Sequence, residues 1–332
     1  MKYNNISKKQ IFTGVVASAS SKNSEAESPD NIMKETGIWS TAKRDVVVTE
    51  SVIIEYPETI VADYIEIVPS DNKNTFPKTF RIEISDDKVN WKVLQREKDI
   101  TIKDTYKLDI PLSPFSYLKI VINESQNNNY KYYSEINRVY AGTSGVSDIS
   151  ASSEKNEENN VMQLLDDDIK QFWASKTSSN STKEAIQVDL GKIFHVNRIV
   201  LGSSGAAFPE NFSVEASADG DIWTLLFEER NFKAEYYKKY YWDVDLIPAQ
   251  YIRIESKGVK FIGGDYGVQI SNLEIFAAVF TIDHTHNIGG AAPYASIFQA
   301  GIVKLAKDGE DVPGAVIQSS DSRLREASTL FK

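Results

Sequence analysis

The sequence contains no cysteine, so no disulfide can link distant parts of its 332 residues. Secreted proteins with several β domains often carry disulfides, and their absence favours assembly in a reducing cytoplasm. Histidine is scarce too, with three residues in all, and no serine-centred motif of nucleophilic catalysis accompanies them. We therefore expect a protein that is not an enzyme.

A basic excess is also missing. Lys and Arg total 37 against 47 Asp and Glu, which leaves a formal net charge of −10. A surface that binds phosphates needs the opposite balance, so nucleic acid is not expected as the main partner. No run of apolar residues approaches the length that spans a membrane.

Aromatic residues are abundant, with 16 Tyr and 15 Phe beside many β-branched residues. These residue types favour strands over helices. A chain of 332 residues is too long for one ordinary sandwich and fits two domains with an appendage.

The chain also repeats itself. Four motifs recur with displacements of 132 or 134 residues: residues 18–21 as 150–153, 39–40 as 173–174, 76–91 as 208–223, and 117–120 as 251–254. Segments such as 80–84 and 212–216 alternate apolar and polar residues, which predicts short, half-buried strands. We predict an all-β fold with two tandem antiparallel β-sandwiches, joined near the Gly/Ser-rich stretch 141–147.

Five motifs follow one another in the second copy. They are residues 164–173 (with Phe172-Trp173 at the end), 186–191, 217–223, 251–254 and 273–276. This succession resembles the discoidin domain, also called the coagulation factor 5/8 type C domain, over residues 146–279. The first copy, residues 13–142, keeps fewer motifs and is interpreted as a degenerate member of the same jelly-roll fold.

Residues 1–12 precede the first copy. Lys2, Lys8 and Lys9, followed by the apolar residues of 11–19, imitate a short signal peptide. The apolar run is interrupted, however, and the repeat uses the same residues as its first strand. We interpret residues 1–12 as an N-terminal arm rather than a cleaved leader.

A glycine-rich loop of the second copy, residues 257–267, is the candidate ligand-binding loop. It combines flat apolar side chains with charged ones, as sugar or peptide binding requires. The candidate residues are Lys260, Phe261, Asp265 and Tyr266. The alternative is that Phe261 only caps the end of the sandwich.

The four tryptophans that recur between the copies have another interpretation. Trp39, Trp91, Trp173 and Trp223 stand at equivalent places in both copies. We expect core or turn packing, with the indole N–H bonded to a loop carbonyl, rather than sugar stacking.

The acidic loop 166–168 suggests a calcium site through Asp166 and Asp168. The family resemblance implies Ca²⁺ in the comparable loop of carbohydrate-binding relatives, together with a Glu from the closing strand. This sequence has Asn272 there, which weakens the prediction. A solvated acidic loop is the alternative.

The last part of the chain, residues 280–332, has a different character. Residues 298–310 and 321–324 resemble the short repeat of phage tail fibres. A segment this small needs partners for stability, so we expect a trimerising fibre segment, after which further repeats would follow. A disordered or partly helical tail is the alternative.

Two histidines introduce that segment. In an extended strand His284 and His286 project to the same side, and three chains would offer six imidazole nitrogens around a three-fold axis. Such a set suits Fe²⁺ or another first-row transition metal. Two exposed histidines in a linker are the alternative.

Together these features predict a non-enzymatic structural and adhesive component of a phage tail, such as a tail fibre or baseplate-associated protein in the virion. It would be a homotrimer, assembled in the host cytoplasm, whose modules bind a host-surface glycan or a neighbouring tail or baseplate protein. The alternative is a secreted or surface-anchored bacterial carbohydrate-binding protein.

Overall fold

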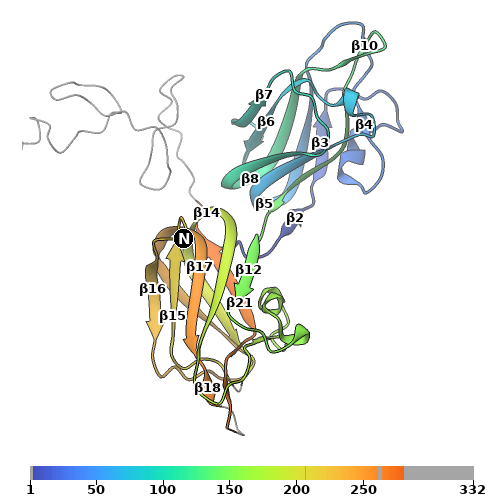
Figure 1. Ribbon diagram of the computed structural model, residues 1–332. Coiled ribbons are helices and arrows are strands. Elements are labelled where there is room, and N and C mark those ends of the chain that lie inside the picture. The colour runs from blue at the N-terminus through green and yellow to red at the C-terminus, as the bar shows by residue number, and fades with distance from the viewer. Residues whose placement is uncertain (1–2, 206, 261–263, 280–332) are drawn as a thin grey trace, which may run out of the picture. The chain divides into compact units, whose positions relative to one another are not determined.

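The computed structural model describes residues 3–205, 207–260 and 264–279, and Figure 1 shows it as a ribbon. Within these residues the chain consists mainly of β-strands. Its helical segments are four short 3-10 turns: η1 (Pro29–Met33), η2 (Lys73–Thr75), η3 (Glu157–Asn159) and η4 (Val161–Leu165). None of these described helices is long and apolar enough to cross a membrane. The all-β prediction is confirmed.

The first sandwich contains an eight-stranded antiparallel sheet. Its strands follow the order β2-β11-β5-β8-β6-β7, while β3 pairs with β5 and β4 pairs with β11. Their bounds are β2 (Gln10–Phe12), β3 (Val15–Ala19), β4 (Trp39–Ser40), β5 (Glu50–Pro69), β6 (Thr79–Ser85), β7 (Lys92–Glu97), β8 (Tyr106–Glu124) and β11 (Glu135–Thr143). A separate hairpin of β9 (Asn127–Asn128) and β10 (Lys131–Tyr132) connects β8 to β11.

The second sandwich repeats this topology. Its seven-stranded sheet follows the order β1-β21-β14-β17-β15-β16, and β12 pairs with β14. The bounds are β1 (Asn4–Asn5), β12 (Asp148–Ala151), β14 (Lys183–Ser203), β15 (Phe212–Ser217), β16 (Thr224–Glu229), β17 (Lys238–Lys257) and β21 (Asn272–Ala277). Two small pairs complete it: β13 (Trp173–Ala174) with β20 (Gln269–Ile270), and β18 (Val259–Lys260) with β19 (Tyr266–Gly267).

Several strands are much longer than the short strands expected from the sequence. β5 and β14 span 20 and 21 residues. The register of β5 with β8 jumps between Glu55 and Ile60, and that of β14 with β17 jumps between Asp189 and Phe194. Such an irregularity bends a strand, so its two halves join the two layers of one sandwich. Pro57 lies inside the jump, where its missing N–H breaks no ladder hydrogen bond.

Each sandwich has its own hydrophobic core. Ile54 and Ile120 are fully buried in the first, and their repeat counterparts Val188 and Ile254 are buried in the second. Full burial of a side chain of this size stabilises a fold by about 1.5–3 kcal/mol. The repeated apolar positions therefore specify two cores of the same design.

The N-terminal arm contributes a strand to each sandwich. β2 pairs with β11, the last strand of the first sandwich, and β1 pairs with β21, the last strand of the second. Ile6, directly after β1, is fully buried in the second core. The arm is thus part of both folds.

Candidate functional site

A hairpin of the first sandwich carries the most exposed large hydrophobic side chain among the described residues. β9 and β10 pair Asn127 with Tyr132 and Asn128 with Lys131, which leaves Asn129 and Tyr130 as a two-residue turn. Both turn residues have a positive φ, 51° and 64°, as a type I′ turn requires. Tyr130 is 90% exposed. Residues 127–133 are called the tyrosine hairpin below.

The tyrosine hairpin is fixed to the loop that follows β4. Main-chain hydrogen bonds join Arg44 and Tyr132 in both directions, at 3.1 and 2.8 Å. The Thr41 N–H donates to the Ser134 carbonyl at 3.0 Å, and the Thr41 hydroxyl accepts from the Ser134 N–H at 3.0 Å. The Lys131 ammonium lies 2.6 Å from a carboxylate oxygen of Asp45.

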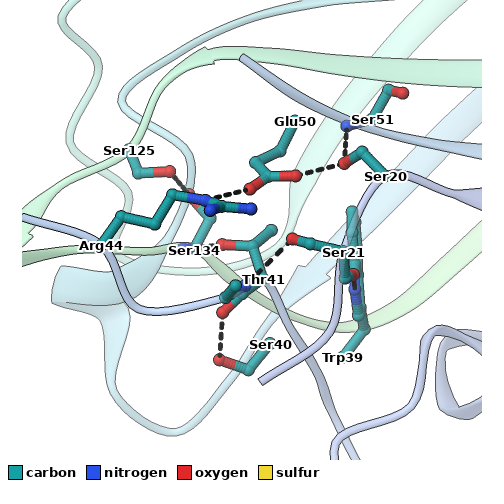
Figure 2. A network of polar contacts seen from close by, with 11 residues as sticks. Ser20, Ser21, Trp39, Ser40, Thr41, Arg44, Glu50, Ser51, Ser125 and Ser134 are labelled. Atoms are coloured by element: carbon teal, nitrogen blue, oxygen red, sulfur yellow. Dashed lines mark hydrogen bonds and ion pairs between the residues drawn. The ribbon is translucent and has the colours of Figure 1, made fainter. Parts of the chain in front are cut away.

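A buried carboxylate in turn holds this loop. Glu50 is 3% exposed and accepts hydrogen bonds from the Ser20 hydroxyl and from Arg44 Nε, the latter at 3.2 Å. Ser20 Oγ also accepts the Ser51 N–H at 2.8 Å. Figure 2 shows this network together with Thr41, Ser125 and Ser134 at the base of the hairpin. A buried polar network therefore holds the tyrosine hairpin in place.

The surroundings of the hairpin offer charges and hydrogen-bonding groups. The Lys43 ammonium lies 4.7 Å from the centre of the Tyr133 ring. Burial, followed by the neighbouring Glu135 and Glu27, raises the pKa of the Tyr133 phenol, which therefore stays protonated at neutral pH. Asn127, the partner of Tyr132 in the hairpin, is exposed. The tyrosine hairpin thus carries aromatic, amide and charged side chains.

The second sandwich has equivalent hydrogen bonds at the place that corresponds to the base of the tyrosine hairpin. Ser175 stands for Thr41, and its N–H and hydroxyl bond the Val268 carbonyl and N–H, both at 3.0 Å. Main-chain bonds of 3.0 and 2.7 Å join Ser178 and Tyr266, the counterparts of Arg44 and Tyr132. The buried Glu184 replaces Glu50 and accepts from three hydroxyls instead of an arginine. The two sandwiches thus share these anchoring hydrogen bonds.

Two of the four ligand-binding residues predicted from the sequence are described in full. Tyr266 is half-buried and pairs in register with Lys260, and Asp265 is exposed. Phe261 lies outside the described residues, as does the side chain of Lys260. The predicted loop therefore stands on the anchored hairpin β18–β19, and its role as a ligand site stays a prediction.

Sequence reasoning missed the tyrosine hairpin, because the first copy was interpreted as degenerate. The signal was the segment Asn127-Asn128-Asn129-Tyr130, followed by Lys131 and two more tyrosines. Asparagine tolerates positive φ, so the run of asparagines marks a tight turn beside aromatic residues.

Two segments of the chain, residues 16–136 and 148–266, match the model of the F5/8 type C domain. Together they account for well over half of the chain. The chain belongs to the F5/8 type C domain family. Both copies, the degenerate first one included, are F5/8 type C domains, and no catalytic domain lies in the matched segments.

Several solved structures show detectable similarity to the chain. The CBM32-1 and CBM32-2 domains of ZmpB from Clostridium perfringens, in complex with GalNAc, are 12% identical with a TM-score of 0.34, covering 79% of this chain and 90% of that one. A fucolectin from striped bass (Morone saxatilis) serum is 10% identical with a TM-score of 0.36, covering 85% and 100%. The CBM32-3 module of a family 31 glycoside hydrolase from Clostridium perfringens is 15% identical with a TM-score of 0.36, covering 39% and 90%. No curated protein matches the sequence.

The acidic loop of the second F5/8 type C domain is exposed. The Asp166 carboxylate accepts the Asp168 N–H at 2.8 Å, and the Asp168 carboxylate accepts the Lys170 N–H at 3.0 Å. The Asn272 amide donates directly to the Asp166 carbonyl at 3.0 Å. Among the described residues, no three His, Cys, Asp or Glu side chains are grouped to hold a metal ion. The calcium site stays a prediction, and His284 and His286 lie outside the described residues.

The tryptophans of the two F5/8 type C domains pack as predicted. Trp39 and Trp173 are fully buried, and their indole N–H groups donate to the carbonyls of Ser21 and Ser153 at 2.9 and 3.0 Å. Trp91 and Trp223 are part-exposed, and donate to loop carbonyls at 3.2 and 3.0 Å. The packing interpretation is confirmed for all four.

Proposed function

We propose that the chain is a non-catalytic carbohydrate-binding protein and that the tyrosine hairpin of its first F5/8 type C domain contacts the glycan. Tyr130 offers a flat apolar ring for the C–H face of a sugar. Lys131, the next residue of the hairpin, its partner Asp45, and the exposed Asn127 of the opposite strand supply hydrogen-bonding groups. Carbohydrate sites combine these two kinds of group.

The backbone at Tyr130 is the observation that carries this proposal. Its φ of 64° is unfavourable for a residue with a Cβ, and its ring is 90% exposed. The strained conformation costs about 1–3 kcal/mol, and the exposed ring returns little of that through burial. Folding alone therefore does not explain a tyrosine here, whereas presentation of an aromatic ring does.

The proposal favours the carbohydrate-binding alternative over a phage tail. The tail interpretation depends on residues 280–332, which lie outside both the described residues and the family match. A trimerising fibre segment remains a separate proposal, compatible with glycan binding by the two domains. Location in a virion tail or at a bacterial surface depends on the same segment.

Glycan binding by the full chain, measured on a glycan array and then by calorimetry with the best ligand, tests the proposal. We expect Tyr130→Gly to weaken binding by about tenfold or more, equal to about 1.4 kcal/mol. The melting temperature should stay the same or rise, because glycine relieves the positive φ.

The matched control is Tyr237→Gly. Tyr237 is also exposed, at 57%, and has a φ of 54°, but it lies between β16 and β17 and not on a hairpin held by the buried polar network. This variant should bind like the original chain. A Tyr266→Ala variant measures how much the predicted loop of the second domain contributes to glycan binding. Unchanged binding by Tyr130→Gly would contradict the proposal.

A further inference from the structure

The last strands of the two sandwiches are equivalent, and each has a short strand on its outer edge. In the first sandwich Gly142 pairs with Ile11 of β2. In the second, Phe276 pairs with Asn5 of β1. Gly142 and Phe276 are repeat counterparts, since they face Tyr64 and Arg198 on the strands β5 and β14. β1 therefore holds in the second sandwich the place that β2 holds in the first.

In the described part of the chain, the link between the two sandwiches is too short to supply such a strand to the second one. β11 ends at Thr143 and β12 begins at Asp148, so only residues 144–147 connect the two domains. This connection lies against the arm: the Val146 N–H donates to the Ser7 carbonyl at 3.2 Å. Gly145 has a φ of +73°, and a Cβ there would meet Lys9 N at 2.4 Å. Residues 144–147 thus only link the two sandwiches and supply no strand for the edge of β21.

The arm fills the vacant place with specific contacts. Ile6 is fully buried in the second core, and its N–H donates to the Ile275 carbonyl at 2.8 Å. The Asn4 amide donates to the Ala277 carbonyl at 3.2 Å. The Arg198 guanidinium lies 3.6 Å from the centre of the Tyr3 ring. Backbone, core and surface of the second sandwich all receive a group from residues 3–7.

Residues 4–7 follow the same pattern of residue types as residues 10–13, which include β2. Residues 4–7 read Asn-Asn-Ile-Ser, and residues 10–13 read Gln-Ile-Phe-Thr. Both have an amide, then any residue, then a large apolar residue, then a hydroxyl. Ile6 and Phe12 occupy the third place, and each packs against the core of its own sandwich. The same pattern of residue types thus pairs with the last strand of each sandwich, β11 in the first and β21 in the second.

We propose that residues 3–7 are a donor strand, and that the outer edge of β21 is a binding site for an extended peptide whose isoleucine becomes buried. In this chain residues 3–7 occupy that site. The second sandwich therefore depends for its completion on residues that precede the whole first sandwich.

A deletion of residues 2–7 with peptide rescue tests the proposal. The shortened chain should melt about 10 °C lower in the transition of the second sandwich, because it loses a buried isoleucine and a strand pairing. A synthetic peptide of residues 1–9 should bind it saturably and restore the melting temperature. The same peptide with Ile6→Asp should do neither. Melting unchanged by the deletion, or equal rescue by both peptides, would overturn the proposal.

A cross-link decides the matter if the shortened chain does not fold. The chain has no native cysteine, so Asn5→Cys with Phe276→Cys introduces a single pair at directly opposed positions. Opposed Cα atoms of an antiparallel pair lie about 4.5–5.5 Å apart, within disulfide range. We expect a disulfide within one chain, seen by mass spectrometry. The control, Asn5→Cys with Glu274→Cys, is one diagonal step out of register and should stay reduced. A disulfide between two chains, or none, contradicts the proposal.

Discussion

Two aspartates illustrate how single residues shape this molecule. Asp87 accepts the N–H groups of Val89 and Asn90 at 2.9 and 2.7 Å. Asp219, its repeat counterpart, accepts those of Asp221 and Ile222, both at 2.9 Å. The donated N–H groups stabilise the charged carboxylate and lower the pKa of both aspartates. Each carboxylate closes the turn between two strands.

The lowered pKa of Asp219 predicts a pH-dependent stability. The contribution of its carboxylate is fully present above the unfolded pKa of about 3.9 and is lost as the pH falls through the lower, folded pKa. Asp219→Asn should therefore lower the melting temperature at pH 7, and the difference should shrink in acid. Melting curves at pH 7, 4 and 2.5 measure this. Asp221→Asn, a change at the exposed neighbour, is the control, and a difference independent of pH would contradict the argument.

At the residue scale the sequence predicted burial better than exposure. Trp39 and Trp173 were assigned to packing because they recur, and both are fully buried. Tyr130 does not recur in the second copy, so the repeat gave no information about its burial. Its exposure depends on the two-residue length of one turn, which follows from the pairing of β9 with β10 rather than from the composition of the loop.

At the scale of elements, the alternation of apolar residues predicted the strands but not their lengths. The pattern is interrupted near Tyr56-Pro57, which reads as the end of a strand. In the structure β5 continues through this point, because a register jump accommodates the proline. Which halves join which layer depends on pairing partners far away in the chain, and a local pattern contains no such information.

One of the bonds that hold the tyrosine hairpin is made by the hydroxyl of Thr41. Thr41 and Ser134 are fully buried, and Thr41 Oγ1 accepts the Ser134 N–H at 3.0 Å. Thr41→Val leaves this N–H without its partner, which costs about 1–3 kcal/mol. We expect that loss of unfolding free energy in urea, together with weaker glycan binding.

The second sandwich supplies the control for this change. It has Ser175 at the position of Thr41, with the same bond to the Val268 N–H. Thr41→Ser should therefore keep both stability and binding near the original values. If Thr41→Val and Thr41→Ser behave alike, the hydroxyl does not anchor the hairpin.

For the whole molecule, the internal repeat predicted the two domains correctly because their cores use the same positions. Ile120 and Ile254 are buried at equivalent places 134 residues apart. The use of the N-terminal arm as a strand was not predicted. A two-residue strand has too little periodicity to detect, and its partner β21 lies more than 260 residues away.

The segment after the second domain carries a prediction that rests on the sequence alone. If His284 and His286 bind a transition metal on a three-fold axis, the purified full chain should sediment as a trimer and contain metal. Binding should weaken below about pH 6, because ligation requires neutral imidazoles. Metal analysis beside a His284→Ala/His286→Ala variant measures this, and a metal-free trimer would refute it.

The pairing of β1 with β21 also has a mechanical consequence. Asn4 and Ala277 face each other, so the described chain begins and ends at two adjacent points of one sheet. A pull on these two points acts across the ladder, and its few hydrogen bonds break one after another rather than together. The arm would then peel away at low force, before the long strands of either sandwich carry any load. Tension along the chain would thus be felt first by the second sandwich, as the loss of Ile6 from its core.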